Sequence, residues 1–260
     1  MIPKKIHYCW FGRNPLPDLA QKCIASWKKY CPDYEIIEWN EDNFDIHCNS
    51  YVEEAYEAKK WAFISDVARL YALVNYGGIY MDTDVEVLKP LDSLLNFEAV
   101  SGFESNSQIP TGLMASCKGQ KMFVELLHEY DTIHFKQKDG SLDLTTNVVR
   151  ITNACSKYGF VANNKQQTVN GFTFLPSDYL CPKNNITGEL HITPNTIVIH
   201  HFDGSWLSPE KKYQYSIQKK FARHLPKSLS ILLAKTISVT KHRGMGALFQ
   251  EFFKWKKERE

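Results

Sequence analysis

Two aspartates separated by one residue form the pattern in this sequence with the clearest chemical use. Asp82 and Asp84 follow a Gly77-Gly78 pair and the apolar, β-prone run 79–81. Alternation along a strand would send both carboxylates to the same side. Oxygen ligands held together in this way suit Mg²⁺ or Mn²⁺, which keep open positions for phosphate oxygens. The spacing therefore predicts a divalent-metal site suited to a reaction whose leaving group is a diphosphate.

The same pair of carboxylates has two other interpretations. One is a solvated acidic turn or helix cap that holds no ligand. The other is a phosphatase of the haloacid dehalogenase type, in which Asp82 would be the nucleophile. Such phosphatases carry Thr or Val two residues after the second aspartate, where this chain has Glu86. The mismatch favours the metal site, and the phosphatase is kept as the alternative.

A second polar pair, Asp66 and Arg69, lies in a segment with helical spacing. Residues three apart share one face of a helix, so the two side chains could simply form an exposed ion pair, which contributes little to stability. This segment is apolar on most of its surface, however, so the pair is expected to point into a polar site. Arginine donates in a plane to phosphate or sugar oxygens, and aspartate accepts from sugar hydroxyls.

Two further clusters have both a binding and a structural interpretation. His200 and His201 follow the run 196–199, which is β-branched throughout, and either could add a nitrogen ligand to a metal held by Asp84. The alternative is a core histidine packed beside an aromatic ring. Trp10, at the end of the first predicted strand, would stack on a nucleobase or belong to the core.

The apolar spacing predicts the strands and helices that carry these residues. Strands are predicted at 6–10, 34–39, 79–81, 99–103, 172–175 and 196–200, and helices at 18–30, 52–76 with a break near Trp61, 121–134 and 146–158. The strand–helix–strand opening indicates an α/β fold with parallel strands, in which ligands collect at the carboxyl ends of strands. The aspartate pair follows such an end.

Charge divides the chain unevenly. Residues 211–260 hold 13 Lys and Arg against 3 Asp and Glu, whereas residues 1–210 hold 18 against 26. We therefore expect a catalytic domain over 1–208 and a basic, mainly helical extension over 209–260. Seven cysteines without a C-x-x-C pair indicate free thiols in a reducing cytosol. No signal peptide is expected, and no apolar run approaches the roughly 20 residues that span a bilayer.

Taken together, these clusters resemble the DXD-containing glycosyltransferases of capsular and O-antigen polysaccharide synthesis, glycosyltransferase family 32. That family includes the yeast initiating α-1,6-mannosyltransferase and is distantly similar to the glucosylating domains of clostridial toxins. The resemblance implies a GT-A fold, with a Rossmann-like mixed sheet flanked by helices, and retention of anomeric configuration. It also implies Mn²⁺ or Mg²⁺ and a nucleotide-sugar donor, with a UDP-sugar such as UDP-galactose favoured. The segments that carry it are 2–12, Ser65 to Arg69, Tyr76 to Asp84, and His200 to Trp206.

The resemblance assigns a role to each matched residue. Catalysis would rest on Asp66, Arg69, Asp82 and Asp84. The donor would be bound by Trp10, Asp66, Arg69, Asp82, Ser205 and Trp206, and the metal by Asp82, Asp84 and His200 or His201.

Partners follow from the same resemblance. The acceptor would be a saccharide, usually linked to a lipid diphosphate, at the inner face of the bacterial cell membrane. The basic extension 211–260, with Phe221, Phe249, Phe252, Phe253 and Trp255, would then attach a cytoplasmic enzyme to the anionic membrane surface. A solvated charged face is the alternative, and no nucleic acid is expected as a partner. A toxin-like transferase acting on protein and a non-catalytic adaptor are the other functional alternatives.

Overall fold

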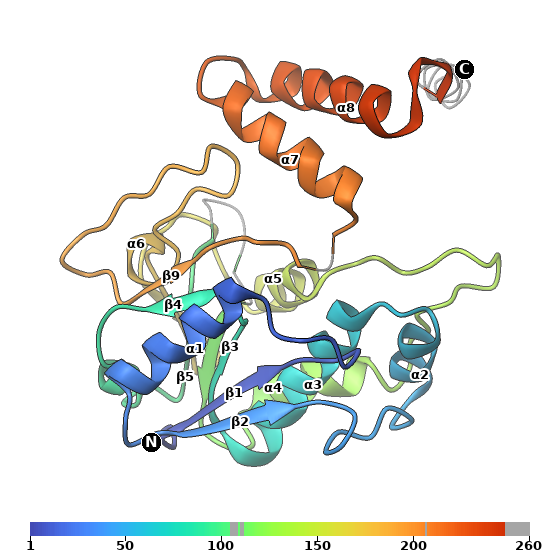
Figure 1. The fold of residues 1–260 in the computed structure, drawn as a ribbon. Coiled ribbons are helices and arrows are strands. Elements are labelled where there is room, and N and C mark those ends of the chain that lie inside the picture. Colours follow the sequence, from blue (N-terminus) through green and yellow to red (C-terminus); the bar gives the residue numbers. More distant parts are fainter. Residues whose placement is uncertain (105–108, 110–111, 206, 248–260) are drawn as a thin grey trace. The chain divides into compact units, whose positions relative to one another are not determined.

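The computed structural model describes residues 1–104, 109, 112–205 and 207–247, which fall into two compact units (Figure 1). The first unit contains residues 1–183 and 191–202. The second contains 184–190 and the chain from Asp203 onward. The first unit carries the Asp82–Asp84 pair, so its architecture decides how the predicted site is built. The predicted domain boundary at residue 208 stays a prediction.

A seven-stranded mixed sheet forms the centre of the first unit, in the order β2-β1-β3-β6-β5-β8-β7. β1 pairs in parallel with β2 and β3, and β5 with β8, whereas the β3–β6, β5–β6 and β7–β8 pairs are antiparallel. The strands are β1 (Lys5–Cys9), β2 (Glu35–Trp39), β3 (Gly78–Met81), β5 (Ala99–Gly102), β6 (Leu113–Ser116), β7 (Gln167–Val169) and β8 (Phe172–Leu175).

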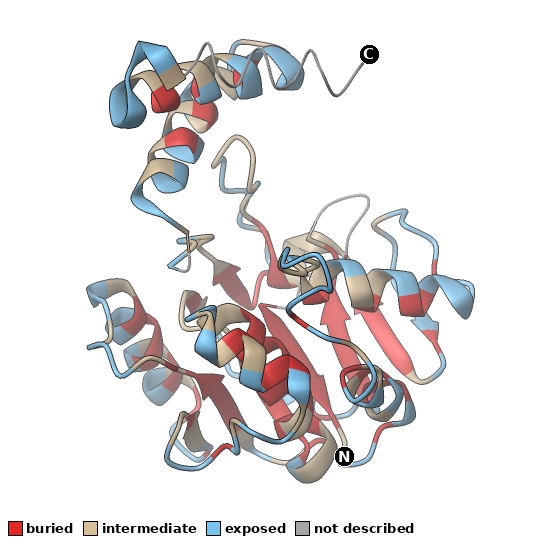
Figure 2. Ribbon diagram, turned by 90° about the vertical axis from the view of Figure 1, so that its right-hand side faces the viewer, coloured by how far each residue is buried: buried red, intermediate tan, exposed pale blue. Residues whose placement is uncertain are grey.

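Helices cover both faces of this sheet, and its inner strands are buried, whereas the edge strands β2 and β7 are partly exposed (Figures 1 and 2). One face packs against α2, α3, α4 and α5, and the other packs against α1 and a small second sheet. The prediction of an α/β fold with a mixed sheet flanked by helices is confirmed. The helices are α1 (Asp18–Tyr30), α2 (Ser50–Glu57), α3 (Trp61–Tyr76), α4 (Lys121–Glu129) and α5 (Asn147–Lys157).

Helix α1 occupies the predicted residues 18–30 because it has one apolar face. Cys23, Ile24 and Trp27 are buried on it. The indole N–H of Trp27 donates to the carbonyl of Val85 at 2.7 Å. Helix α1 therefore holds the strand that follows the aspartate pair, as well as covering the main sheet.

The turn between α3 and β3 depends on a glycine. Gly77 has a φ of +65°, and its N–H donates to the carbonyl of Leu73 at 3.0 Å to end the helix. A Cβ at this position would lie 2.7 Å from the backbone nitrogen of Lys118. Glycine thus satisfies both the backbone conformation and the close approach of a neighbouring segment. The turn sends the chain from the helix that carries Asp66 into the strand that leads to Asp82.

Several elements of the first unit are shorter than predicted, or were not predicted at all. The helix predicted at 121–134 ends at Glu129. A second, two-stranded sheet pairs β4 (Val85–Val87) with β9 (Val198–His200), and neither β4 nor β6 was predicted. A 3₁₀ turn (Leu91–Leu94) and the short helix α6 (Ser177–Leu180) complete the unit. All seven cysteines are free, as predicted.

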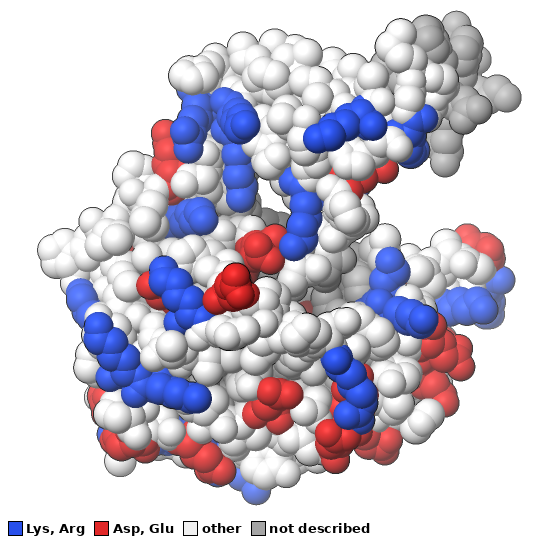
Figure 3. Space-filling model, viewed as in Figure 1, with Lys and Arg blue, Asp and Glu red and all other residues white. Residues whose placement is uncertain are grey.

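The second unit is a helical hairpin of α7 (Pro209–Ala222) and α8 (Lys227–Arg243). The Ser238 hydroxyl donates to the Glu210 carbonyl at 2.8 Å, and the Lys241 ammonium lies 3.8 Å from the ring centroid of Tyr213. Figure 3 shows lysine and arginine side chains over these helices. Within the described residues, no helix combines the length and apolarity needed to cross a membrane.

Candidate functional site

The two aspartates are brought together by a turn, not by strand alternation. Strand β3 ends at Met81, and the N–H of Val85 donates to the carbonyl of Asp82 at 3.0 Å. The N–H of Asp82 donates to the carbonyl of Gly112 at 2.8 Å. The prediction that both carboxylates share a strand face is therefore wrong in its geometry, because the chain reverses between β3 and β4. The turn nevertheless places the two side chains next to each other.

His200 joins this turn through the small second sheet. Strands β4 and β9 are antiparallel, and Val85 is the register partner of His200. Nε2 of His200 lies 3.3 Å from a carboxylate oxygen of Asp84. The neighbouring His201 turns elsewhere, and its Nε2 contacts the carboxylate of Glu86 at 2.8 Å. Of the two histidines, it is His200 that the fold places beside the aspartate pair.

Asp82, Asp84 and His200 fit a divalent cation. Each offers one ligand atom, and these three atoms lie within 4.8 Å of one another. Nδ1 of His200 is also buried and makes no hydrogen bond within the described residues. Two carboxylates with one imidazole suit Mn²⁺ or Mg²⁺ chemistry and leave further positions for oxygen ligands of a substrate. Burial alone would lower the pKa of His200, but the Asp84 carboxylate raises it well above its ordinary value.

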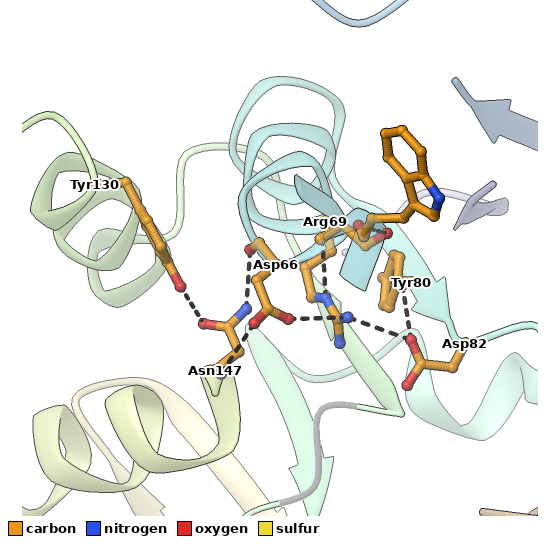
Figure 4. A network of polar contacts seen from close by, with 8 residues as sticks. Asp66, Arg69, Tyr80, Asp82, Tyr130 and Asn147 are labelled. Atoms are coloured by element: carbon orange, nitrogen blue, oxygen red, sulfur yellow. Dashed lines mark hydrogen bonds and ion pairs between the residues drawn. The ribbon is translucent and has the colours of Figure 1, made fainter. Parts of the chain in front are cut away.

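A buried chain of polar groups leads from this cluster to helix α3 (Figure 4). An Nη atom of Arg69 lies 3.4 Å from Asp82 and 3.1 Å from Asp66. Asp66 and Arg69 are only 7% and 5% exposed, because α3 is enclosed by apolar packing on most of its surface. The sequence-based expectation that this pair faces a polar site agrees with its position beside Asp82.

Tyr80 is a member of the site that the sequence analysis did not single out. Its hydroxyl donates to a carboxylate oxygen of Asp82 at 2.8 Å. Its ring lies under the guanidinium of Arg69, 4.5 Å from centroid to Cζ. The signal was present in the sequence, since residues two apart near the end of a strand project to the same side.

Burial and charge set the protonation of these groups. Burial raises the pKa of Asp66 to about 6, against the opposing influence of Arg69. Burial would lower the pKa of Arg69, but Tyr80, Asp82 and Asp66 together raise it above its ordinary value, so the guanidinium stays charged. Burial also raises the pKa of Tyr80 well above its usual range, so its hydroxyl remains a donor. The site therefore keeps one permanent cation close to two carboxylates.

Three residues of the predicted donor site remain, namely Trp10, Ser205 and Trp206. The indole N–H of Trp10 donates to the carbonyl of Asn14 at 2.6 Å, and its ring is half-buried against the core on the α1 side of the sheet. Ser205 belongs to the second unit, and Trp206 lies outside the described residues. Their roles in donor binding stay predictions. The tail residues Phe249, Phe252, Phe253 and Trp255 also lie outside the described residues.

Among known proteins, this chain is similar to glycosyltransferases. Residues 17–101 match the family model described as "Glycosyltransferase sugar-binding region containing DXD motif". The chain is 28% identical over 142 residues, 52% of its length and 38% of the relative's, to "Inositol phosphoceramide mannosyltransferase 3" of Schizosaccharomyces pombe. It is also 28% identical over 149 residues, 53% of its length and 37% of the relative's, to "Mannosyl phosphorylinositol ceramide synthase CSH1" of Saccharomyces cerevisiae. The match therefore spans less than two-fifths of each of these relatives.

Among solved structures, the chain is similar to "PaToxG Glycosyltransferase", with a TM-score of 0.48 and 20% identity over 60% of this chain and 69% of that one. It is also similar to the galactosyltransferase LgtC, solved with donor and acceptor sugar analogues. There the TM-score is 0.39, with 14% identity over 86% of this chain and 98% of that one.

Proposed function

We propose that this chain, which matches a DXD glycosyltransferase family model over residues 17–101, is a metal-dependent glycosyltransferase that moves a hexose from a nucleotide sugar to a saccharide acceptor. The observation that carries the proposal is the meeting of Asp82, Asp84 and His200 at the end of a strand whose neighbouring helix presents the buried Asp66–Arg69 pair. The cluster of Asp82, Asp84 and His200 suits a cation that binds a diphosphate, and the Asp66–Arg69 pair suits the sugar. Their adjacency is what transfer from a sugar diphosphate requires.

Each group has a separate task in this reaction. A cation held by Asp82, Asp84 and His200 would act as a Lewis acid toward the diphosphate leaving group. Arg69 brings a fixed positive charge to the same place, and its buried position makes that charge act more strongly than it would in water. Asp66 accepts from hydroxyl groups of the donor sugar and so orients the anomeric carbon.

Retention of configuration requires either an enzymic nucleophile or attack from the face that the leaving group departs. The sequence marks no Asp or Glu as a nucleophile at the anomeric carbon. We therefore favour front-face attack, in which the acceptor hydroxyl approaches on the side of the departing diphosphate.

The identity of the hexose has two candidates. The family resemblance favours a UDP-sugar such as UDP-galactose. The curated relatives are named as mannosyltransferases, which favours mannose and hence a nucleotide-mannose donor. The inositol phosphoceramide in the name of the first also agrees with an acceptor that has a lipid part.

A donor panel with a matched pair of variants tests the proposal. Purified protein is mixed with Mn²⁺ and UDP-galactose, UDP-glucose, UDP-N-acetylglucosamine or GDP-mannose, and nucleotide release and thermal shift are followed. We expect release from one donor, lost in Asp84→Asn and kept in Asp92→Asn, which changes an exposed carboxylate of the same unit. Release of phosphate from phosphomonoesters, with no response to any nucleotide sugar, would instead support a phosphatase that uses Asp82.

We further propose that the second unit attaches the enzyme to an anionic membrane surface, at the inner face of a bacterial cell membrane where lipid-linked acceptors are found. Helix α8 supports this through an unusual distribution of side chains. It buries the small residues Ser230, Ala234 and Ser238, each fully, while Leu229 and Leu232 are 41% and 60% exposed. Leucines exposed on a basic helix are typical of helices that lie on an anionic membrane surface.

Vesicle co-sedimentation of the full chain tests this attachment. Leu232→Glu should reduce binding to phosphatidylglycerol vesicles, whereas Ser228→Glu adds the same charge at another exposed position of α8 and should have a smaller effect. Equal binding of both variants and the unchanged protein would reject attachment through α8.

A further inference from the structure

The carboxylate of Asp66 is held by a residue far away in the sequence. The backbone N–H of Asn147 donates to Oδ2 of Asp66 at 3.2 Å, and the side-chain amide of Asn147 donates to the backbone carbonyl of Asp66 at 2.9 Å. One residue thus contacts both the side chain and the main chain of Asp66. Asn147 is only 1% exposed, so no solvent competes for these bonds.

The position of Asn147 in its helix explains why its N–H is available. Asn147 is the first residue of α5, and an N–H in the first turn of a helix has no partner within the helix. The helix dipole also favours negative charge at this end. Helix α5 therefore directs a donor and a positive dipole end at the carboxylate of Asp66.

Tyr130 fixes the side chain of Asn147. The Tyr130 hydroxyl donates to Oδ1 of Asn147 at 3.2 Å, from a ring that is 1% exposed just beyond the end of α4. An amide can rotate to exchange its oxygen and nitrogen. The backbone carbonyl of Asp66 only accepts, so it selects the orientation in which the nitrogen faces it, and the Tyr130 hydroxyl holds the oxygen in that orientation (Figure 4).

We propose that Asn147 is a positioning residue for Asp66, and that Tyr130 holds Asn147 in the orientation this role requires. The inference rests on the proposed function, in which Asp66 accepts hydrogen bonds from the donor sugar. In that role the carboxylate must keep one rotamer and stay ionised while Arg69 pulls it from the other side. The two hydrogen bonds of Asn147 oppose that pull, because they fix the helix backbone at Asp66 and bind its second carboxylate oxygen.

The test compares Asn147→Ala, which loses the side-chain amide, with Asn147→Pro, which loses the amide and the backbone N–H, so the two variants differ by the hydrogen bond to the Asp66 carboxylate. Asn147→Ala keeps the backbone N–H, whereas Asn147→Pro removes it. Proline is tolerated at the first position of a helix, and Thr146 before it is already extended, with a ψ of 158°. Tyr130→Phe removes only the hydroxyl. Tyr158→Phe is the matched control, because it removes a hydroxyl that donates to the exposed side of Glu125.

The first measurement follows the ionisation of Asp66 by carboxyl NMR, with the signal assigned from Asp66→Asn. The groups that face this carboxyl are Arg69 on α3, Asp82 beyond β3, Arg150 on α5 and the phenols of Tyr51 and Tyr130. All of them are unchanged between Asn147→Ala and Asn147→Pro. We expect the pKa of Asp66 to be higher in Asn147→Pro than in Asn147→Ala, and equal pKa values would overturn the inference.

The second measurement is a double-mutant cycle on donor affinity. We expect Asn147→Pro to weaken donor binding by about tenfold, as for loss of a hydrogen bond to a charged group, and Tyr130→Phe by less. In the Asp66→Asn background neither change should weaken binding further, because both act through Asp66. A loss that persists in that background would show that Asn147 contacts the donor directly, and the positioning role would be rejected. If the unchanged protein binds no nucleotide sugar, the proposed function fails, and the NMR titration still decides the relation of Asn147 to Asp66.

Discussion

Replacing Asp66 by asparagine should make the folded protein more stable at neutral pH while abolishing transfer. The reason is the burial of the carboxyl, which raises its pKa from the ordinary 3.8 to about 6. The folded chain then binds this proton more tightly than the unfolded chain does. The protonated Asp66 carboxyl therefore adds to the free energy of unfolding. This stabilising contribution is fully present below about pH 4 and is lost as the pH rises to about 6.

The size of the effect follows from the same two values. A rise in pKa from 3.8 to about 6 corresponds to about 3 kcal/mol, and the side chain is buried, so solvent screening does not reduce it appreciably. Near pH 4 the wild type carries a protonated carboxyl and should be about as stable as Asp66→Asn. At pH 7 the variant should be more stable by up to about 3 kcal/mol.

Urea unfolding of both proteins at pH 4, 5, 6 and 7 measures this difference. Other groups titrate over the same range, but they are common to both proteins and cancel in the comparison. Asp45→Asn, which changes an exposed carboxyl, controls for the substitution itself and should stay within about 0.5 kcal/mol of wild type. The reasoning is refuted if Asp66→Asn loses stability relative to wild type as the pH rises. That result would mean that the ion pair with Arg69 outweighs burial.

Three further outcomes are expected. A Cβ on Gly112 would lie 2.7 Å from Nδ1 of His200, so Gly112→Ala should displace the imidazole. Calorimetry should then show an Mn²⁺ affinity about tenfold weaker. The control is Gly246→Ala, whose Cβ would meet no atom within 4 Å and which should leave the affinity unchanged. Trp27→Phe leaves the carbonyl of Val85 without its 2.7 Å hydrogen bond and opens a cavity, which should cost about 2 to 3 kcal/mol in chemical denaturation. Removal of divalent cations with EDTA should stop transfer, and Mn²⁺ or Mg²⁺ should restore it; full activity in EDTA would contradict a metal-dependent reaction.

The sequence predicted those parts of the fold and site that depend on local patterns. The apolar face of α1 and the glycine that ends α3 gave correct element limits, because each signal lies within the element itself. Strand β4 has three residues, too few for a periodic signal, and this strand brings His200 to Asp84. The choice of His200 beside the aspartates therefore needed the structure. The role of Asn147 could not be predicted either. It lies 81 residues from Asp66 in the sequence, and no local pattern indicates that α5 brings it into contact with α3.

The pairing of β4 with β9 also has a consequence for the order in which the protein is made. The last strand of the main sheet ends at Leu175, whereas His200 closes the cluster with Asp82 and Asp84 25 residues later. A nascent chain can therefore complete its main sheet while its third cation ligand, already synthesised, still lies inside the ribosomal exit tunnel. Cation capture would then occur late in synthesis, and a product truncated before residue 200 would retain the sheet without the histidine ligand.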